Sequence, residues 1–105
     1  MHRNIDYYIT NKILYMQHFT QDELYILKTV SDIIKEQRIS HNKSQRLLAD
    51  EYDLQKSMIS RLENGKNEPL LFSIWKISYA LGLKPSELLR LVEERLAKDI
   101  TLLDI

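Results

Sequence analysis

The chain has 105 residues, of which 44% are hydrophobic and 29% are charged, with 15 basic and 15 acidic side chains. This length gives room for one domain, and the hydrophobic content supports a core, which excludes a globally disordered chain. Only two glycines and two prolines occur, too few for the frequent turns of an all-β fold, so we expect helices. The zero net charge counts against nucleic-acid binding unless the basic side chains gather on one face.

Several classes of site are excluded by what the sequence lacks. It has no cysteine for a disulfide or a cysteine-based zinc site, and His2, His18 and His41 do not have the spacing of metal ligands. No run of about 18 apolar residues is present to cross a membrane, and the N-terminus lacks the features of a signal peptide. We therefore expect a cytoplasmic protein with no metal and no cofactor.

The first two predicted helices lie in the N-terminal third of the chain. Apolar residues recur at helical spacing near the N-terminus, which predicts a helix over residues 4–17. Thr20 and Glu23 have the spacing of a capping box, in which each side chain satisfies a free backbone N–H group of the other residue. This box predicts the start of a second helix that runs to about residue 39.

Two short helices come next. Ser44 is a favourable N-cap for a helix over residues 45–51, and a turn leads to another helix over residues 56–63. Gly65 ends the second of them, because glycine readily takes the left-handed conformation at a helix end. Helices of about eight residues are marginal alone. Such a pair is typical of a helix-turn-helix, in which one helix enters the major groove of DNA.

Two longer helices complete the predicted order. Apolar residues at helical spacing predict a helix over residues 71–81, and Pro85 opens a last helix that runs to about residue 98. We therefore expect an all-α fold with three parts. These are an N-terminal helical extension over residues 1–20, a helical domain over residues 21–98 and an apolar tail over residues 99–105.

The two short predicted helices carry a specific pattern. It consists of Ser44-Gln45-Arg46-Leu47-Leu48-Ala49 and, after the turn, Ile59-Ser60-Arg61-Leu62-Glu63-Asn64-Gly65. This pattern closely resembles the Cro/C1-type (Xre) helix-turn-helix family of phage repressors and their bacterial relatives. The resemblance extends without insertion from about residue 34 to residue 89. It implies a lambda-repressor-like bundle of five helices that binds double-stranded DNA.

The resemblance also implies a role for each matching position. The recognition helix would contact base edges through its exposed side chains, which are Gln55, Lys56, Ser57 and Arg61. Phosphates would be contacted from the first motif helix and from the loop after the recognition helix, by Gln45, Arg46, Lys43, Asn64, Lys66 and Asn67. Arg38 and Glu63 match a structural ion pair that ties the recognition helix to the helix before the motif.

The sequence departs from the family pattern at two positions. Asp53 stands in the turn where glycine is common, and aspartate tolerates the left-handed conformation better than most residues. Lys43 stands where a buried leucine is usual, so we expect different packing there, with the N-terminal extension as the candidate neighbour. We expect the acidic residues Asp50, Glu51 and Asp53 to lie on the side turned away from DNA, because they would repel phosphate.

A second copy of the chain is expected to complete the DNA-binding unit. One recognition helix contacts only a few base pairs, so we expect a homodimer on a palindromic operator with half-sites about one helical turn apart. The last predicted helix has more apolar surface than one buried side needs. Its interface candidates are Leu88, Leu89, Val92 and Leu96. The apolar N-terminal segment is a second candidate, unless it folds back over its own domain.

We predict a dimeric transcriptional regulator, most simply a repressor that blocks a promoter. Two alternatives stay open. One is the antitoxin of a toxin–antitoxin pair, in which a terminal segment covers a toxin protein while the motif represses the operon. The other is an interaction adaptor that has lost DNA binding, which the net neutrality supports. An enzyme is not expected, because the sequence has no nucleophile–base pair, phosphate loop or metal motif.

Overall fold

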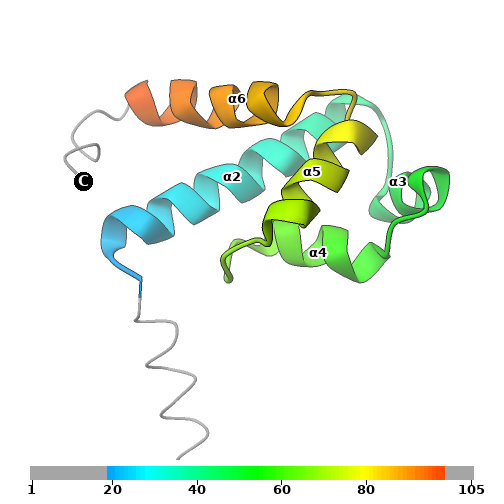
Figure 1. Cartoon of the computed structure of the whole chain (residues 1–105), viewed down its shortest axis with the longest axis horizontal. Coiled ribbons are helices and arrows are strands. Elements are labelled where there is room, and N and C mark those ends of the chain that lie inside the picture. Colours follow the sequence, from blue (N-terminus) through cyan, green and yellow to red (C-terminus); the bar gives the residue numbers. More distant parts are fainter. Residues whose placement is uncertain (1–18, 99–105) are drawn as a thin grey trace, which may run out of the picture.

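The computed structural model describes residues 19–98, which form five α-helices and no β-strand (Figure 1). The helices are α2 (Gln21–Ser40), α3 (Gln45–Tyr52), α4 (Lys56–Asn64), α5 (Leu71–Ala80) and α6 (Pro85–Lys98). The all-α prediction is confirmed for this part of the chain, and the predicted helix bounds agree to within about one residue. The predicted helix over residues 4–17 and the tail over residues 99–105 lie outside the described residues.

The long helix α2 begins at the predicted capping box. The backbone N–H of Glu23 donates to Thr20 Oγ1 at 3.1 Å, and the backbone N–H of Thr20 donates to Glu23 Oε1 at 2.9 Å. Two backbone donors that have no partner within the helix are thereby satisfied. From this start α2 extends along the molecule and packs mainly against α6 and α4. Within residues 19–98, no helix is long and apolar enough to cross a membrane.

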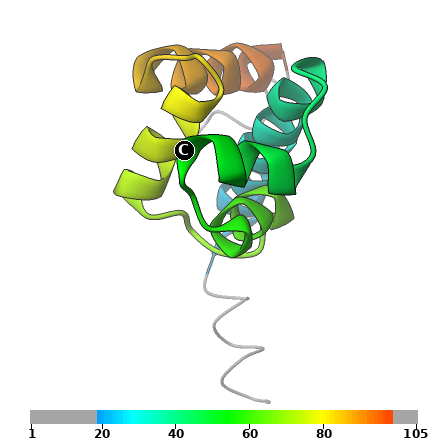
Figure 2. The same ribbon diagram turned by 90° about the vertical axis from the view of Figure 1, so that its right-hand side faces the viewer.

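The core draws on all five described helices. Its fully buried apolar side chains are Ile34, Leu48, Ile59, Ile77, Leu81 and Leu88. Burial of each such side chain contributes roughly 1.5–3 kcal/mol relative to exposure. Seen from the α3 end, α3 and α4 lie in front of α2, with α5 and α6 beside and above them (Figure 2). The short helices α3 and α4 are therefore stabilised by this shared burial rather than by their own length.

Most of the α6 residues that were predicted to form a dimer interface are buried within the chain itself. Leu88, Val92 and Leu96 recur every four residues along one stripe, and all three are buried in the chain's own core. Of the four predicted interface residues, Leu89 alone is exposed, at 45%. The other three side chains pack within the chain's own core, because α2 packs against that stripe, so an interface through α6 would depend on Leu89.

Candidate nucleic-acid interface

The turn between α3 and α4 is built on a left-handed residue. Asp53 has φ 54° and ψ 46°, as its place in the sequence pattern predicted. The next backbone N–H, that of Leu54, donates to the carbonyl oxygen of Ala49 at 2.8 Å, which closes the turn. The Leu54 side chain packs against the core and holds the turn down. The left-handed conformation costs an aspartate about 1 kcal/mol relative to glycine, and this burial offsets the cost.

The amino end of α3 is fixed by its cap and by a contact with α4. Ser44 Oγ accepts from the backbone N–H of Leu47 at 3.0 Å, which confirms the predicted N-cap. The next residue, Gln45, is half-buried, and its Nε2 donates to Glu63 Oε1 at 3.1 Å. The side-chain amide that the sequence assigned to a phosphate thus also links the two motif helices.

Glu63 lies at the centre of a network that joins α2, α3 and α4. Arg38 donates to it from two nitrogens, from Nε to Oε2 at 2.7 Å and from Nη2 to Oε1 at 2.9 Å. Arg38 Nη1 also donates to the carbonyl oxygen of Lys43 at 2.8 Å. The hydrogen bonds with Glu63 raise the pKa of the Arg38 guanidinium above its ordinary value. Because the Glu63 side chain is only 4% exposed, its negative charge is neutralised inside the fold.

A second contact between α2 and α4 was not foreseen from the sequence. Ser31 Oγ is buried and donates to the carbonyl oxygen of Leu62 at 2.6 Å. Gly65 follows with φ 71°, and a Cβ atom there would lie 3.1 Å from Ser31 Oγ, so both the conformation and the space favour glycine. Helical spacing in the sequence could have indicated this contact. Ser31 lies on the same side of α2 as the buried Leu27 and Ile34, and a polar residue at such a position needs a hydrogen-bond partner.

The outer side of α4 presents the four predicted base-contacting residues. Gln55, Lys56, Ser57 and Arg61 are all exposed. Gln55 occupies the N-cap position of α4, but its side chain makes no capping hydrogen bond. Among residues 19–98, neither Lys56 nor Arg61 forms an ion pair with an acidic side chain. This row of α4 is therefore a set of hydrogen-bond donors and positive charges directed at solvent.

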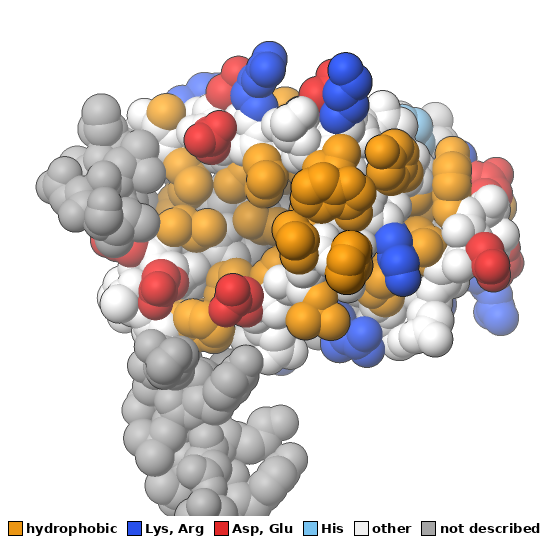
Figure 3. Space-filling view, in the orientation of Figure 1, with side chains coloured by type: hydrophobic (Ala, Val, Ile, Leu, Met, Phe, Trp, Pro, Cys, Tyr) orange, Lys and Arg blue, Asp and Glu red, His pale blue; other side chains and the backbone are white. Residues whose placement is uncertain are grey.

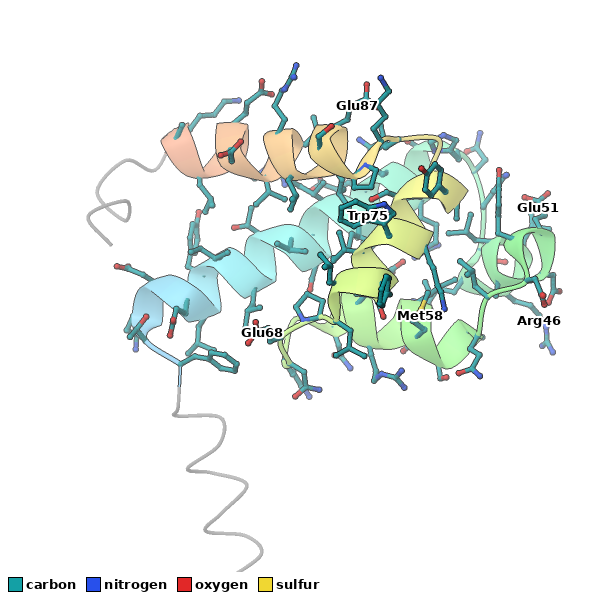
Figure 4. All side chains as sticks on the ribbon, in the orientation of Figure 1. Arg46, Glu51, Met58, Glu68, Trp75 and Glu87 are labelled. Atoms are coloured by element: carbon teal, nitrogen blue, oxygen red, sulfur yellow. The ribbon has the colours of Figure 1, made fainter. Side chains whose placement is uncertain are left out.

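The predicted phosphate-contacting residues divide into free and engaged side chains. Arg46 on α3 and the loop residues Asn64, Lys66 and Asn67 are exposed, and Figure 4 shows Arg46 at the end of the molecule that α3 forms. Lys43 is engaged: its Nζ lies 2.5 Å from Glu51 Oε1 and 5.5 Å from the centre of the Tyr52 ring. The hydrogen bond with Glu51 raises the pKa of Lys43. In the described residues Lys43 thus packs against α3 itself, and the expected contact with the extension falls mainly outside them.

A shallow groove of about 300 Å³ beside α4 adds a residue that the sequence did not suggest. Lys76 of α5 is exposed and lines this groove together with Gln55 and Arg61. The sequence analysis did not identify Lys76, because it lies beyond the motif in a segment whose apolar residues were used only to predict a helix. Asp53 lines the same groove, which corrects the expectation that the whole acidic group is turned away from the predicted DNA side. A carboxylate there opposes phosphate binding.

This arrangement of helices is shared with known proteins. A model of the helix-turn-helix family matches residues 34–88, from the second half of α2 into α6. The control protein C.BamHI of Bacillus amyloliquefaciens is 48% identical over 48 residues, which are 46% of this chain and 59% of that protein. The chain thus spans less than two thirds of that relative. The clp gene regulator ClgR of Corynebacterium glutamicum has a similar fold, with a TM-score of 0.61, 18% identity and coverage of 72% of this chain and 81% of that chain.

Proposed function

Because this chain belongs to the Cro/C1-type helix-turn-helix family of DNA-binding regulators, we propose that it binds duplex DNA sequence-specifically and regulates transcription. In this proposal α4 enters the major groove, where the exposed side chains on its outer side contact base edges. One observation carries the proposal. The carboxylate of α4, that of Glu63, is turned inward against Arg38, whereas Lys56 and Arg61 face solvent without an acidic partner in the described residues.

The charge distribution supports DNA binding by a chain whose net charge is zero. Several acidic side chains are paired away from the outer side of α4, such as Glu36 with Arg95 and Asp32 with Lys28. The proposed phosphate contacts are Arg46, Asn64, Lys66 and Asn67, together with Gln45 at the start of α3 and Lys76 in the groove. Lys43 makes this contact only if it leaves Glu51, an exchange that costs little for a partly exposed pair.

We further propose that the chain acts as a homodimer on a palindromic operator and represses transcription by blocking a promoter. A pair of α4 helices would read two half-sites about one helical turn apart, which gives a longer and more specific site than one helix can read. The names of the two similar proteins, a control protein and a gene regulator, support a role in regulation. Occlusion of a promoter requires only a DNA-binding domain.

The test is selection of bound duplexes from a random pool at two salt concentrations. We expect enrichment of an inverted repeat, because both half-sites meet the same helix of a symmetric dimer. On the enriched duplex, Arg61→Ala should weaken binding by about 1–3 kcal/mol and relax the preference at one base pair of each half-site. Arg90→Ala is the matched control, since Arg90 is also exposed but lies on α6. It should bind like the unchanged protein.

A second variant separates base contacts from phosphate contacts. Lys76→Ala should weaken binding to all duplexes alike and reduce the salt dependence of the binding constant by about one ion. Absence of any enriched duplex from folded protein would contradict sequence-specific binding. If Arg61→Ala and Arg90→Ala bound the enriched duplex equally well, the assignment of Arg61 to a base would be wrong.

A further inference from the structure

The helix α5 exposes a continuous apolar surface that nothing in the described chain covers. We define the α5 apolar face as the exposed side chains at its start and along its outer side, which are Leu70 (74% exposed), Leu71 (64%), Phe72 (76%), Trp75 (44%) and Tyr79 (63%). Figure 3 shows these apolar side chains gathered over α5 at the centre of the molecule. Large apolar residues at such exposure are costly in a chain that stays alone in water.

The size of this face is that of a protein interface. With about 150–250 Å² for each large side chain, the exposed fractions correspond to roughly 600 Å² of apolar surface. Monomeric proteins rarely expose a contiguous apolar patch above about 300–600 Å², and a standard interface covers about 800 Å² on each partner. The aromatic side chains of the α5 apolar face also belong to the residue types that contribute most of the binding energy at interfaces.

We propose that the α5 apolar face is the surface through which two copies of this chain pair. The inference rests on the proposed function, because it identifies where the two DNA-binding subunits meet. It replaces the buried stripe of α6, whose Leu88, Val92 and Leu96 already belong to the core. The partner is therefore a second copy of the chain, held by the same residues on both sides of a two-fold axis.

The position of α4 favours a second copy over another kind of protein. When α5 faces the reader, α4 lies along the lower edge of the molecule (Figure 1). Consider a second copy placed face to face on the α5 apolar face and related to the first by a two-fold axis that runs vertically in this view. Both α4 helices then lie along the same lower edge of the dimer, on one surface. Two half-sites on one face of a DNA duplex require that arrangement. The recognition helices and the interface are thus compatible in one dimer.

The charges around the face are complementary under the same rotation. Glu68 lies to the left of the α5 apolar face (Figure 4), whereas basic side chains border the face directly on its right, with a mixture of acidic and basic side chains farther out at that end (Figure 3). A copy turned face to face about the vertical axis places its acidic side opposite the basic side of the first. Such a polar rim around an apolar centre is typical of specific interfaces and fixes their register.

The short C-terminal segment is a less suitable occupant than a second copy. Residues 19 and 98 both lie at the left of the molecule, whereas α5 lies to their right (Figure 1). Residues 99–105 span at most about 25 Å when fully extended, since each residue adds about 3.5 Å. A segment that left from residue 98 would have to turn back along the molecule to cover the face. A second copy reaches it directly.

The experiment measures the mass of the full-length chain by analytical ultracentrifugation from nanomolar to high micromolar concentration, together with the fluorescence of Trp75. Trp75 is the only tryptophan of the chain and belongs to the α5 apolar face, so its emission reports on whether the face is covered. The test variant is Tyr79→Lys, in the last turn of α5. The matched control is Ile39→Lys, a residue 53% exposed in the last turn of α2.

We expect the unchanged chain and Ile39→Lys to dimerise with a shift of the Trp75 emission to shorter wavelength. Tyr79→Lys should weaken dimerisation by about tenfold or more, as for the truncation of an interface hot spot. Phe72→Glu, which places a carboxylate in the first turn of α5 where it is favourable, is the second variant in case Tyr79→Lys does not fold. It should weaken dimerisation in the same way.

Three results would overturn the inference. The first is a dimer that Tyr79→Lys and Phe72→Glu leave intact and whose formation leaves the Trp75 emission unchanged. The second is a chain that stays monomeric at every concentration, with its Trp75 already shielded from a soluble quencher, which would show that a segment of the same chain covers the face. The third is a monomer with exposed Trp75 that also binds its selected duplex as a single chain.

This last result would contradict the interface and leave sequence-specific DNA binding intact. A dimer for which no duplex is enriched would contradict the DNA-binding function and leave the interface intact.

Discussion

The helices α5 and α6 are both rich in large apolar residues, but α6 buries most of them whereas α5 exposes several. In α6 the apolar residues form one stripe with a four-residue repeat, and α2 covers it. In α5 one side, with Ile74 and Ile77, is buried in the core, while the other side presents Phe72, Trp75 and Tyr79 to solvent. A helix that is apolar on one side needs one neighbour, and a helix that is apolar on both sides needs two.

This difference indicates which of the two helices has apolar residues that its own core does not need. The count of leucines pointed to α6 as an interface, although its leucines repeat at the spacing of a single buried stripe. The informative pattern was in α5, where seven of the ten residues are apolar and the large ones lie on both the buried and the exposed side. Large apolar residues on both the buried and the exposed side of a ten-residue helix indicate a partner that the described residues do not supply.

The largest effect is expected from a truncation inside the α6 stripe. Leu88→Ala removes a fully buried side chain and should lower the free energy of unfolding by about 2–5 kcal/mol, because the lost burial and the remaining cavity both count. Urea denaturation monitored by circular dichroism measures it. A loss below about 1 kcal/mol, within the range of surface substitutions, would mean that α6 does not hold the core as described.

A smaller effect distinguishes the two helices as interfaces. Leu71→Ser on α5 and Leu89→Ser on α6 replace the same residue type at exposed positions. Leu71→Ser should weaken dimerisation and flatten the dependence of the Tm on protein concentration, since association stabilises only the folded chain. Leu89→Ser should leave that dependence unchanged. The reverse order, with Leu89→Ser as the disruptive variant, would return the interface to α6.

The smallest effect concerns the surface ion pair between α2 and α6. Arg95 donates to Glu36 from two nitrogens at 2.7 and 2.8 Å, and this hydrogen bonding lowers the pKa of Glu36 below its ordinary value. A lowered pKa stabilises the fold above the pKa of the unfolded chain, and this stabilisation is lost as the pH falls through the folded value. Glu36→Gln should therefore reduce stability slightly at neutral pH and not at all in acid. The comparison requires thermal melts at pH 7 and at acid pH, and an equal difference at both would exclude the pair as its cause.

The local features of the fold followed from the sequence because neighbouring residues determine them. The capping box of Thr20 and Glu23, the cap at Ser44 and the left-handed Asp53 and Gly65 all depend on side chains within a few positions of one another. Helix bounds were predicted closely for the same reason. The motif residues, at fixed spacing across two helices, also identified the family.

The tertiary structure alone decided which side chains remain available. Ser31 and Gln45 both contact α4 from other helices, and Lys76 lines the groove beside Gln55 and Arg61 although it lies beyond the motif. Burial and ion pairing depend on which elements meet in space, whereas spacing along the chain reports only on one element at a time. For that reason the sequence determined the helices and the DNA-binding motif of this protein. The packing of α2 against α6, and the absence of a described neighbour for the outer side of α5, led to the interface that we propose for a second copy.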